Sequence, residues 1–243
     1  MANKSSRFEY PSTHAFLIVG CFLSFFFTPL MAEVSVIESL ESASKSVVRI
    51  ETTAVQLYRA KKNLRRVSYT RQGAGVIIAT SGLIATNWHT VKNSGRITVI
   101  FYNGVSVTGR LVRSTPEHDL AFINIQPPYS LTAIKFSDSD LVQLNSKAYT
   151  IGTSKILKNT LSEVQISGIG RKNSRKNPKN SVDMIQINSS AYKGDSGSPL
   201  LDREGHLLGL MVATQTKRGA LTYAIPSNTI KKEIRSNLET SSQ

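Results

Sequence analysis

The chain of 243 residues has room for one large domain or two small ones. Hydrophobic residues make up 40% of it and charged residues 19%, which is typical of a globular protein with a buried core. The formal net charge of +14 favours attraction to acidic surfaces but sets no fold. Cys21 is the sole cysteine, which excludes a disulfide within the chain and a structural zinc site built on cysteines.

The first 32 residues differ from the rest of the chain. Lys4 and Arg7 precede an apolar run, Ala15–Ala32, and this order of basic, apolar and small residues is typical of a secretory signal. We expect cleavage near Ala32, so that the functional domain spans residues 33–243. A retained membrane anchor is the alternative, although the run is at the short end of spanning length and contains Pro29. Both interpretations predict an exported protein, periplasmic or secreted.

After a predicted amphipathic helix at Val34–Lys45, short apolar or alternating segments dominate the chain. Twelve of them follow one another, and the residues between them are mainly Gly, Asn, Ser and Pro, which favour turns. The pieces "GAGVIIA", "RITVIF" and "EVQISGIG" illustrate the pattern. It predicts an all-β chain, with two β-barrel lobes that meet near residues 127–140.

The last segment of the chain has a helical pattern. Ile230, Ile234 and Leu238 recur every four residues, and Ser227 can cap the N-terminus of such a helix. We therefore expect a helix at the end of the chain.

Two stretches are strongly basic and contain no acidic residue. Leu57–Gln72 reads "LYRAKKNLRRVSYTRQ", and Arg171–Asn180 reads "RKNSRKNPKN". Because neither carries apolar periodicity, both are expected to be exposed loops. They are either solvated segments without a role or a surface that attracts polyanions or acidic membrane headgroups.

Three motifs place chemically active residues at the edges of predicted strands. His89 in "TNWHTV" follows an apolar strand, Asp119 in "EHDLAFINI" begins another, and Ser196 lies in the turn "GDSGSP". Their order, His, Asp, Ser, is that of the trypsin-like catalytic triad. An α/β-hydrolase is excluded, because Ser198 occupies the second glycine position of G-x-S-x-G. The histidine of that fold must also follow the serine, and here only His206 does, ten residues on, in a chain without alternating helices.

The segments "GAGVIIATSGLIATNWHTV", "HDLAFINI" and "LTYAIPSNTIKKEI" resemble the HtrA family of trypsin-like serine proteases (the DegP/DegS type). The similarity runs from about Val36 to Leu238. It implies two six-stranded β-barrels of the trypsin-like fold, with a short N-terminal helix and a C-terminal helix. The turn "GDSGSP" departs from that family, which more often has Asn before the serine, and also resembles trypsins. We expect a protease domain without the PDZ module that usually follows it in this family.

The resemblance, together with the chemistry of the three side chains, assigns their roles. His89 takes the proton of the Ser196 hydroxyl and returns it to the leaving amine, while Asp119 fixes the histidine tautomer. The backbone N–H groups of Gly194 and Ser196 are expected to bind the oxyanion. This chemistry needs no metal and no cofactor, and the sequence contains no nucleotide-binding motif.

The substrate pocket is predicted to be small and neutral. Ser190 occupies the place where a trypsin would have Asp, and the strand "GLMVATQ" lacks the histidine of glutamyl endopeptidases. We therefore expect cleavage after Val, Ala, Ile or Leu. The residues predicted to line the pocket are Ser190, Ala191, Ala213, Thr214 and Ala224.

The sequence thus predicts an ATP-independent serine endopeptidase that acts on proteins or peptides through an acyl-enzyme. The resemblance also implies a homotrimer. A non-enzymatic binding protein on the same fold is the alternative, although such relatives usually lose a triad residue and here all three are present.

Overall fold

The computed structural model describes residues 35–60, 63–153, 158–172, 183–189, 194–216 and 219–240. By its internal contacts the chain divides into two units, Met1–Glu38 and Ser39–Gln243, and the architecture below is that of the second unit. The predicted signal or anchor at residues 1–32 lies outside the described part. Within that part, no helix is both long and apolar enough to span a bilayer.

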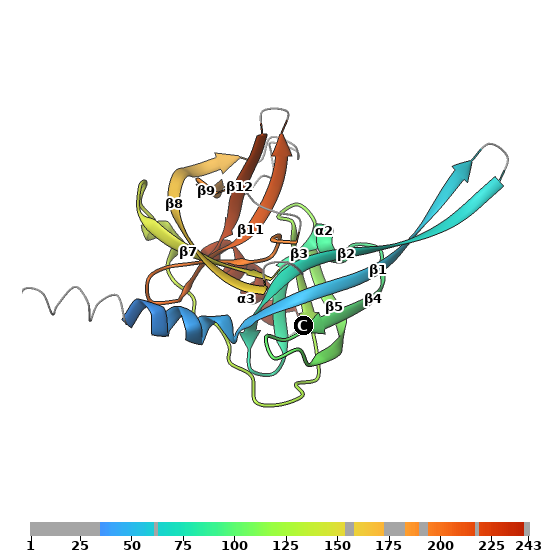
Figure 1. Cartoon of the computed structure of the whole chain (residues 1–243), viewed down its shortest axis with the longest axis horizontal. Helices are drawn as coiled ribbons and strands as arrows, with labels where there is room; N and C mark the ends of the chain where they lie inside the picture. The colour runs from blue at the N-terminus through green and yellow to red at the C-terminus, as the bar shows by residue number, and fades with distance from the viewer. Residues whose placement is uncertain are drawn as a thin grey trace, which may run out of the picture. The chain divides into compact units, whose positions relative to one another are not determined.

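Six antiparallel strands form the first closed barrel, in the order β1-β2-β3-β6-β5-β4 (Figure 1). Side chains alternate between the two faces of a strand, and the inward residues Val48 and Ile50 of β1 and Ile97 and Val99 of β4 are buried in its core. The strands are β1 (Val47–Ala60), β2 (Asn63–Ala79), β3 (Leu83–Asn87), β4 (Ser94–Ile100), β5 (Ser106–Thr115) and β6 (Leu120–Asn124).

The second closed barrel has the order β10-β11-β12-β9-β8-β7. Its core contains the alternating pairs Val164 and Ile166 of β8 and Ile185 and Ile187 of β9. The strands are β7 (Lys147–Thr153), β8 (Lys158–Lys172), β9 (Asp183–Ile187), β10 (Pro199–Leu201), β11 (Leu207–Thr216) and β12 (Gly219–Pro226). The prediction of an all-β chain with two six-stranded barrels is confirmed.

The segment between the barrels, 125–146, is bonded to both of them. The N–H of Ile134 donates to the carbonyl of Ile77 in β2 at 2.8 Å, and the N–H of Leu207 in β11 donates to the carbonyl of Lys135 at 2.7 Å. The predicted meeting point at residues 127–140 falls within this segment.

Helices are few and short within the described residues. A helix spans residues 35–44, within the range predicted for the N-terminal helix. A single turn, α2 (Trp88–Val91), follows β3, and a short 3₁₀ helix, η1 (Ser139–Leu141), lies before the second barrel. The predicted C-terminal helix is α3 (Ser227–Thr240).

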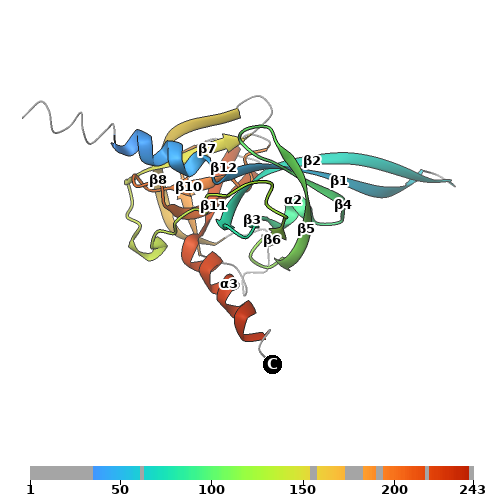
Figure 2. The same cartoon turned by 90° about the horizontal axis from the view of Figure 1, so that it is seen from below.

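The basic stretch 57–72 is not a loop, so that expectation is wrong. It forms the outer part of a long β1–β2 hairpin, in which Leu57 pairs with Arg66 and Tyr58 with Arg65. The hairpin extends beyond the barrel as a two-stranded ribbon (Figure 2). A ribbon outside the barrel has no core to pack against, so its strands need no apolar alternation, and the sequence pattern therefore missed them. Of the second basic stretch, Arg171 and Lys172 end β8, and the rest lies outside the described residues.

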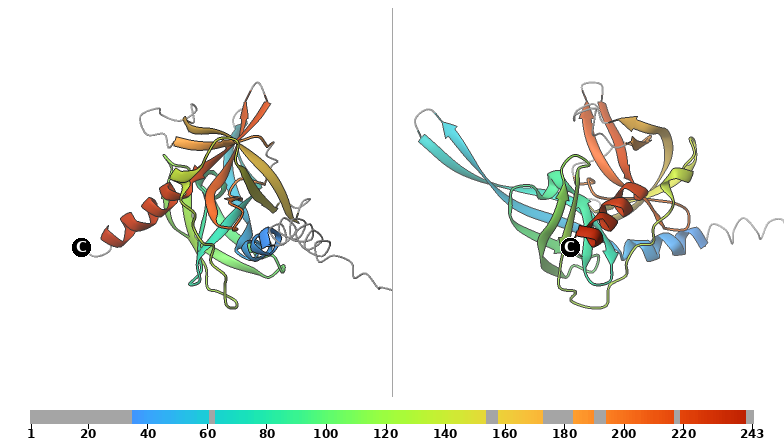
Figure 3. Two further views of the ribbon diagram at one scale, coloured as in Figure 1. Left: turned by 90° about the vertical axis from the view of Figure 1, so that its left-hand side faces the viewer. Right: turned by 180° about the vertical axis from the view of Figure 1, so that it is seen from behind.

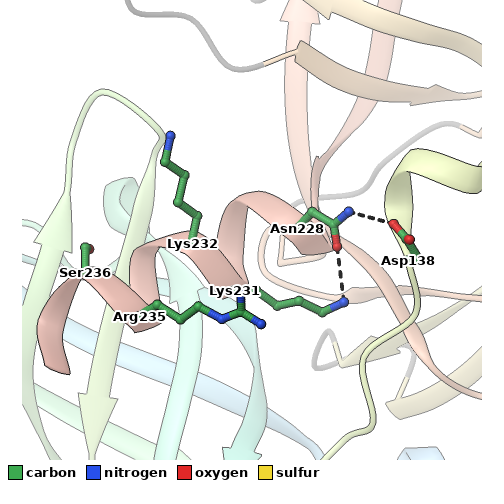
Figure 4. A pocket seen from close by; sticks show the side chains of 6 residues that line it. All are labelled: Asp138, Asn228, Lys231, Lys232, Arg235 and Ser236. Atoms are coloured by element: carbon green, nitrogen blue, oxygen red, sulfur yellow. Dashed lines mark hydrogen bonds between the residues drawn. The ribbon is translucent and has the colours of Figure 1, made fainter. Parts of the chain in front are cut away.

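The N-terminus of α3 is held by the segment that leads into η1. The hydroxyl of Ser227, expected to cap the helix, donates to the carbonyl of Ser137 at 2.9 Å, and the N–H of Asn228 donates to the Ser139 hydroxyl at 3.1 Å. The Asn228 amide also donates to the Asp138 carboxylate at 2.6 Å (Figure 4). This bond, more than any other, lowers the pKa of Asp138 below its usual value, because it favours the ionised form.

Candidate active site

His89 lies on the one-turn helix α2, directly after β3. The turn begins at the end of a buried strand, because the N–H of Trp88 donates to the backbone carbonyl of Asp119 at 2.8 Å. The amide of Asn87 donates to the same carbonyl at 3.3 Å. Two bonds to one carbonyl thus fix where the chain leaves β3 and in which direction α2 projects.

Asp119 is the last residue of the tight turn between β5 and β6. The turn is closed by bonds from the N–H of His118 to the Thr115 carbonyl, 3.1 Å, and from the N–H of Asp119 to the Pro116 carbonyl, 3.2 Å. The φ angle of Asp119 is +57°, in the left-handed region that Asp adopts more readily than most residues. This backbone conformation helps to set the direction in which the carboxylate leaves the turn.

The side chains of His89 and Asp119 are in direct contact. Asp119 Oδ2 lies 2.7 Å from His89 Nδ1, and Oδ1 accepts the backbone N–H of His89 at 3.0 Å. The Asp119 side chain is only 7% exposed, whereas the His89 side chain is 39% exposed. A buried carboxylate therefore orients an imidazole that remains open to a substrate.

Ser196 lies in a turn between Gly194 and β10. The turn is closed by the N–H of Ser198, which donates to the Asp195 carbonyl at 3.0 Å, and is fixed to β11 by the N–H of Gly197, which donates to the Met211 carbonyl at 2.9 Å. Gly194 and Gly197 have φ angles of +107° and +90°, which residues with side chains rarely adopt. The two glycines permit a bend that other residues would resist.

The turn of Ser196 and the helix of His89 meet at Gly73 and Ala74 of β2. The N–H of Ala74 donates to the carbonyl of Ser196 at 2.7 Å. A Cβ on Gly73 would lie 2.8 Å from the methyl carbon of Thr90 and 2.9 Å from the Ser196 carbonyl, so Gly73 lies between the residue after His89 and the serine itself. The structure thereby brings His89 and Asp119 into contact and places the backbone of Ser196, in the turn before β10, close to Thr90, the residue after His89.

The predicted pocket residues are only partly described. Ser190 and Ala191 lie outside the described residues. Ala213 and Thr214 belong to β11 and pair with Thr222 and Leu221 of β12. Ala224 is fully buried and packs in the core of the second barrel.

Three residues that support the site were not among the predicted site residues. Thr52 of β1 donates from its hydroxyl to the carbonyl of Thr90 at 3.0 Å, Asn87 supports Asp119 as described above, and Glu233 of α3 contacts the β5–β6 turn. The position of Asn87, two residues before His89, is the one signal that could have drawn attention to it. Among the described residues no group of three or more His, Cys, Asp or Glu is arranged to hold a metal.

Two closed six-stranded barrels with a His–Asp contact in the first define a trypsin-like peptidase fold. The model of the family described as "Trypsin-like peptidase domain" matches residues 73–210, a range that contains His89, Asp119 and Ser196. The chain belongs to this family.

Within the family, the chain is similar to HtrA proteases. It is 36% identical over 163 residues to the periplasmic serine endoprotease DegP of Escherichia coli, covering 65% of this chain and 34% of DegP. It is 32% identical over 160 residues to the periplasmic pH-dependent serine endoprotease DegQ of the same species, covering 64% of this chain and 35% of DegQ. The chain thus spans about a third of the length of these curated relatives.

The solved structures that resemble this chain are also HtrA-type proteases. A variant of the HtrA-type protease AlgW with a decapeptide superimposes with a TM-score of 0.76 and 25% identity, covering 84% of this chain and 67% of that one. The expected resemblance to HtrA proteases is confirmed over the protease domain.

Proposed function

We propose that this protein is a serine endopeptidase with His89, Asp119 and Ser196 as its catalytic triad. The observation that carries the proposal is the 2.7 Å contact between His89 Nδ1 and Asp119 Oδ2. The Ser196 carbonyl accepts the N–H of Ala74 in β2, next to Gly73, which faces Thr90 on the helix of His89. A non-enzymatic relative would have no need of a buried carboxylate that orients an exposed imidazole.

The chemistry follows from the tautomer that Asp119 selects. The carboxylate accepts the Nδ1 proton of neutral His89, which leaves the Nε2 lone pair free to take the proton of the Ser196 hydroxyl. The serine oxygen then attacks the peptide carbonyl carbon and forms the tetrahedral intermediate. When the carbon–nitrogen bond breaks, His89 gives its proton to the leaving amine and an acyl-enzyme remains. Water, activated by the same histidine, hydrolyses the acyl-enzyme and restores the serine.

The oxyanion of the intermediate is assigned to the backbone N–H groups of Gly194 and Ser196. The φ angle of Gly194, +107°, supports this assignment, since a residue without a side chain permits a tight bend at one of the two donors. Loss of one donor of this kind typically costs about 3 kcal/mol of transition-state stabilisation.

The substrates are proposed to be proteins or peptides, cleaved after small aliphatic residues. AlgW, the structural relative, is described with a bound decapeptide, and the curated relatives DegP and DegQ are periplasmic endoproteases. These comparisons, with the apolar run before residue 33, support an exported location in the periplasm. The homotrimer implied by the family remains a prediction.

A fluorophosphonate probe tests the activity, because it modifies the nucleophile of serine hydrolases and not ordinary serines. We expect wild-type protein to be labelled and to cleave casein, and Ser196→Ala to lose both properties while keeping its melting temperature. Ser198→Ala is the matched control, since it removes a second hydroxyl from the same turn and should remain active. Wild-type cleavage by Ser196→Ala would overturn the assignment of the nucleophile.

A further inference from the structure

Glu233 of α3 is a largely buried acid that the proposed reaction does not use. Its side chain is 11% exposed and lies against the first barrel, although α3 follows the last strand of the second barrel. Figure 3 shows α3 next to the strands of the first barrel. A buried carboxylate is costly unless it is paired, so its partners indicate what it holds in place.

The partners of Glu233 belong to β5 and to the turn that carries Asp119. Oε2 accepts from the Thr115 hydroxyl at 2.8 Å and from Arg113 Nη2 at 3.0 Å, and Oε1 lies 3.0 Å from His118 Nδ1. Arg113 Nη1 also donates to the backbone carbonyl of Glu233 at 2.8 Å. One side chain therefore holds both ends of the turn, Thr115 at its start and His118 directly before Asp119.

The turn needs such support because of its backbone. Asp119 has a φ angle of +57°, a conformation that costs free energy and persists where the surrounding structure fixes it. The carbonyl of Asp119 also accepts from the N–H of Trp88, so a shift of the turn would move α2 and His89 as well.

We propose that Glu233 is a positioning residue, which fixes the β5–β6 turn from outside and so keeps Asp119 in hydrogen-bond contact with His89. The inference rests on the proposed function, in which Asp119 orients the catalytic base. The contact between His89 and Asp119 in the first barrel would then depend on the docking of α3, a helix that follows the second barrel.

The test compares Glu233→Gln with Lys231→Met on the same helix. Lys231 bonds the carbonyl of Ser137 at 2.8 Å and the Asn228 side chain at 3.1 Å, so its loss weakens α3 at a place away from the turn. We expect Glu233→Gln to lower kcat by about tenfold with KM little changed, since an ångström of misplacement can cost about a hundredfold. Lys231→Met should leave kcat within about twofold of wild type, because the turn keeps its partners.

A second readout does not depend on activity. The Nδ1 proton of His89, bonded to Asp119, gives a downfield proton resonance that can be assigned by ¹⁵N-histidine labelling and by its absence in His89→Gln. Glu233→Gln should broaden or shift this resonance, and Lys231→Met should not. If the wild type proves inactive, the proposed function fails, while the resonance still decides whether Glu233 positions the pair.

Thr115→Val provides a milder variant in case Glu233→Gln does not fold, since Glu233 keeps Arg113 and His118 as partners. It should reduce kcat less than Glu233→Gln does, and the double variant should be no worse than Glu233→Gln alone. Wild-type kcat and an unchanged resonance in Glu233→Gln, or in Thr115→Val where only that variant folds, would overturn the proposal. Equal losses of kcat in Glu233→Gln and Lys231→Met would also overturn it, because helix docking in general would then explain both.

Discussion

At the residue scale, Gly197 sets how closely the turn of Ser196 approaches β2. A Cβ at this position would lie 2.0 Å from the backbone oxygen of Ala74, and the φ angle is +90°. Both features exclude a side chain, because backbone atoms on a buried strand cannot move aside. The position of the proposed nucleophile is therefore tied to the absence of a side chain at residue 197.

We predict that Gly197→Ala destabilises the protein by about 2 to 5 kcal/mol, from the strained backbone and from overpacking. Gly104→Ala is the matched control, because Gly104 has a similar φ angle, +87°, but its Cβ would meet no atom within 4 Å. Gly104→Ala should lower the free energy of unfolding by only about 1 kcal/mol. Urea unfolding measures both values, and equal losses would show that the contact with Ala74 is not what requires glycine.

At the scale of elements, α3 is anchored at two places that serve different purposes. Its first turn bonds the segment around η1, through Asn228 to Asp138 and Ser139. Its middle carries Glu233, which bonds the β5–β6 turn. Three basic side chains line a pocket beside the first anchor: Lys231, Lys232 and Arg235 (Figure 4).

The first anchor should weaken in acid. The pKa of Asp138 is lowered in the folded state, chiefly by the Asn228 amide and then by the N–H of Asp140, so the ionised carboxylate stabilises the fold. This contribution is complete above the unfolded aspartate pKa of about 3.9 and is lost as the pH falls through the lower folded value. Wild type should therefore have a higher melting temperature than Asp138→Asn at pH 7, and the difference should shrink as the pH falls below about 4.

Asp140→Asn is the matched control for this prediction, as it removes a neighbouring acid of η1. Melting temperatures of the three proteins, measured by circular dichroism across the acid range, check it. A difference between wild type and Asp138→Asn that stays constant with pH would contradict the assigned role of the carboxylate.

At the scale of the whole molecule, the net charge of +14 is concentrated in two basic stretches. The first is part of the β1–β2 hairpin, and the second begins at the end of β8 with Arg171 and Lys172. Clustered positive charge attracts polyanions. Binding releases the counterions held by the polyanion, so the affinity falls as the salt concentration rises.

We predict that the protein binds heparin, and that a variant with the five cations of the second stretch changed to Gln elutes from a heparin column at lower salt. The changed residues are Arg171, Lys172, Arg175, Lys176 and Lys179. A control of equal charge loss changes five exposed cations elsewhere: Lys45, Lys92, Arg96, Arg110 and Lys135. If both variants elute at the same salt concentration, net charge alone explains the binding and the stretch is not an anion site.

The amino-acid sequence alone predicted the two barrels and the three triad candidates. Alternating apolar residues and turn-forming residues are local features, so the strands containing Ile97, Val99 and Ile185 could be recognised without knowledge of their partners. His89, Asp119 and Ser196 could be predicted because each lies at the edge of such a strand, in a motif that resembles one of the trypsin-like proteases. The sequence could not locate the basic ribbon at 57–72, since strands without a core need no apolar pattern.

Only the tertiary structure decided how these parts support one another. Glu233 lies more than a hundred residues after Thr115 and His118, so its contacts with the β5–β6 turn have no trace in local sequence. The bond from Asn228 to Ser139 at the start of α3 is likewise non-local. Local patterns determine which strands and turns form, whereas packing of distant segments decides which side chain fixes Asp119 against His89.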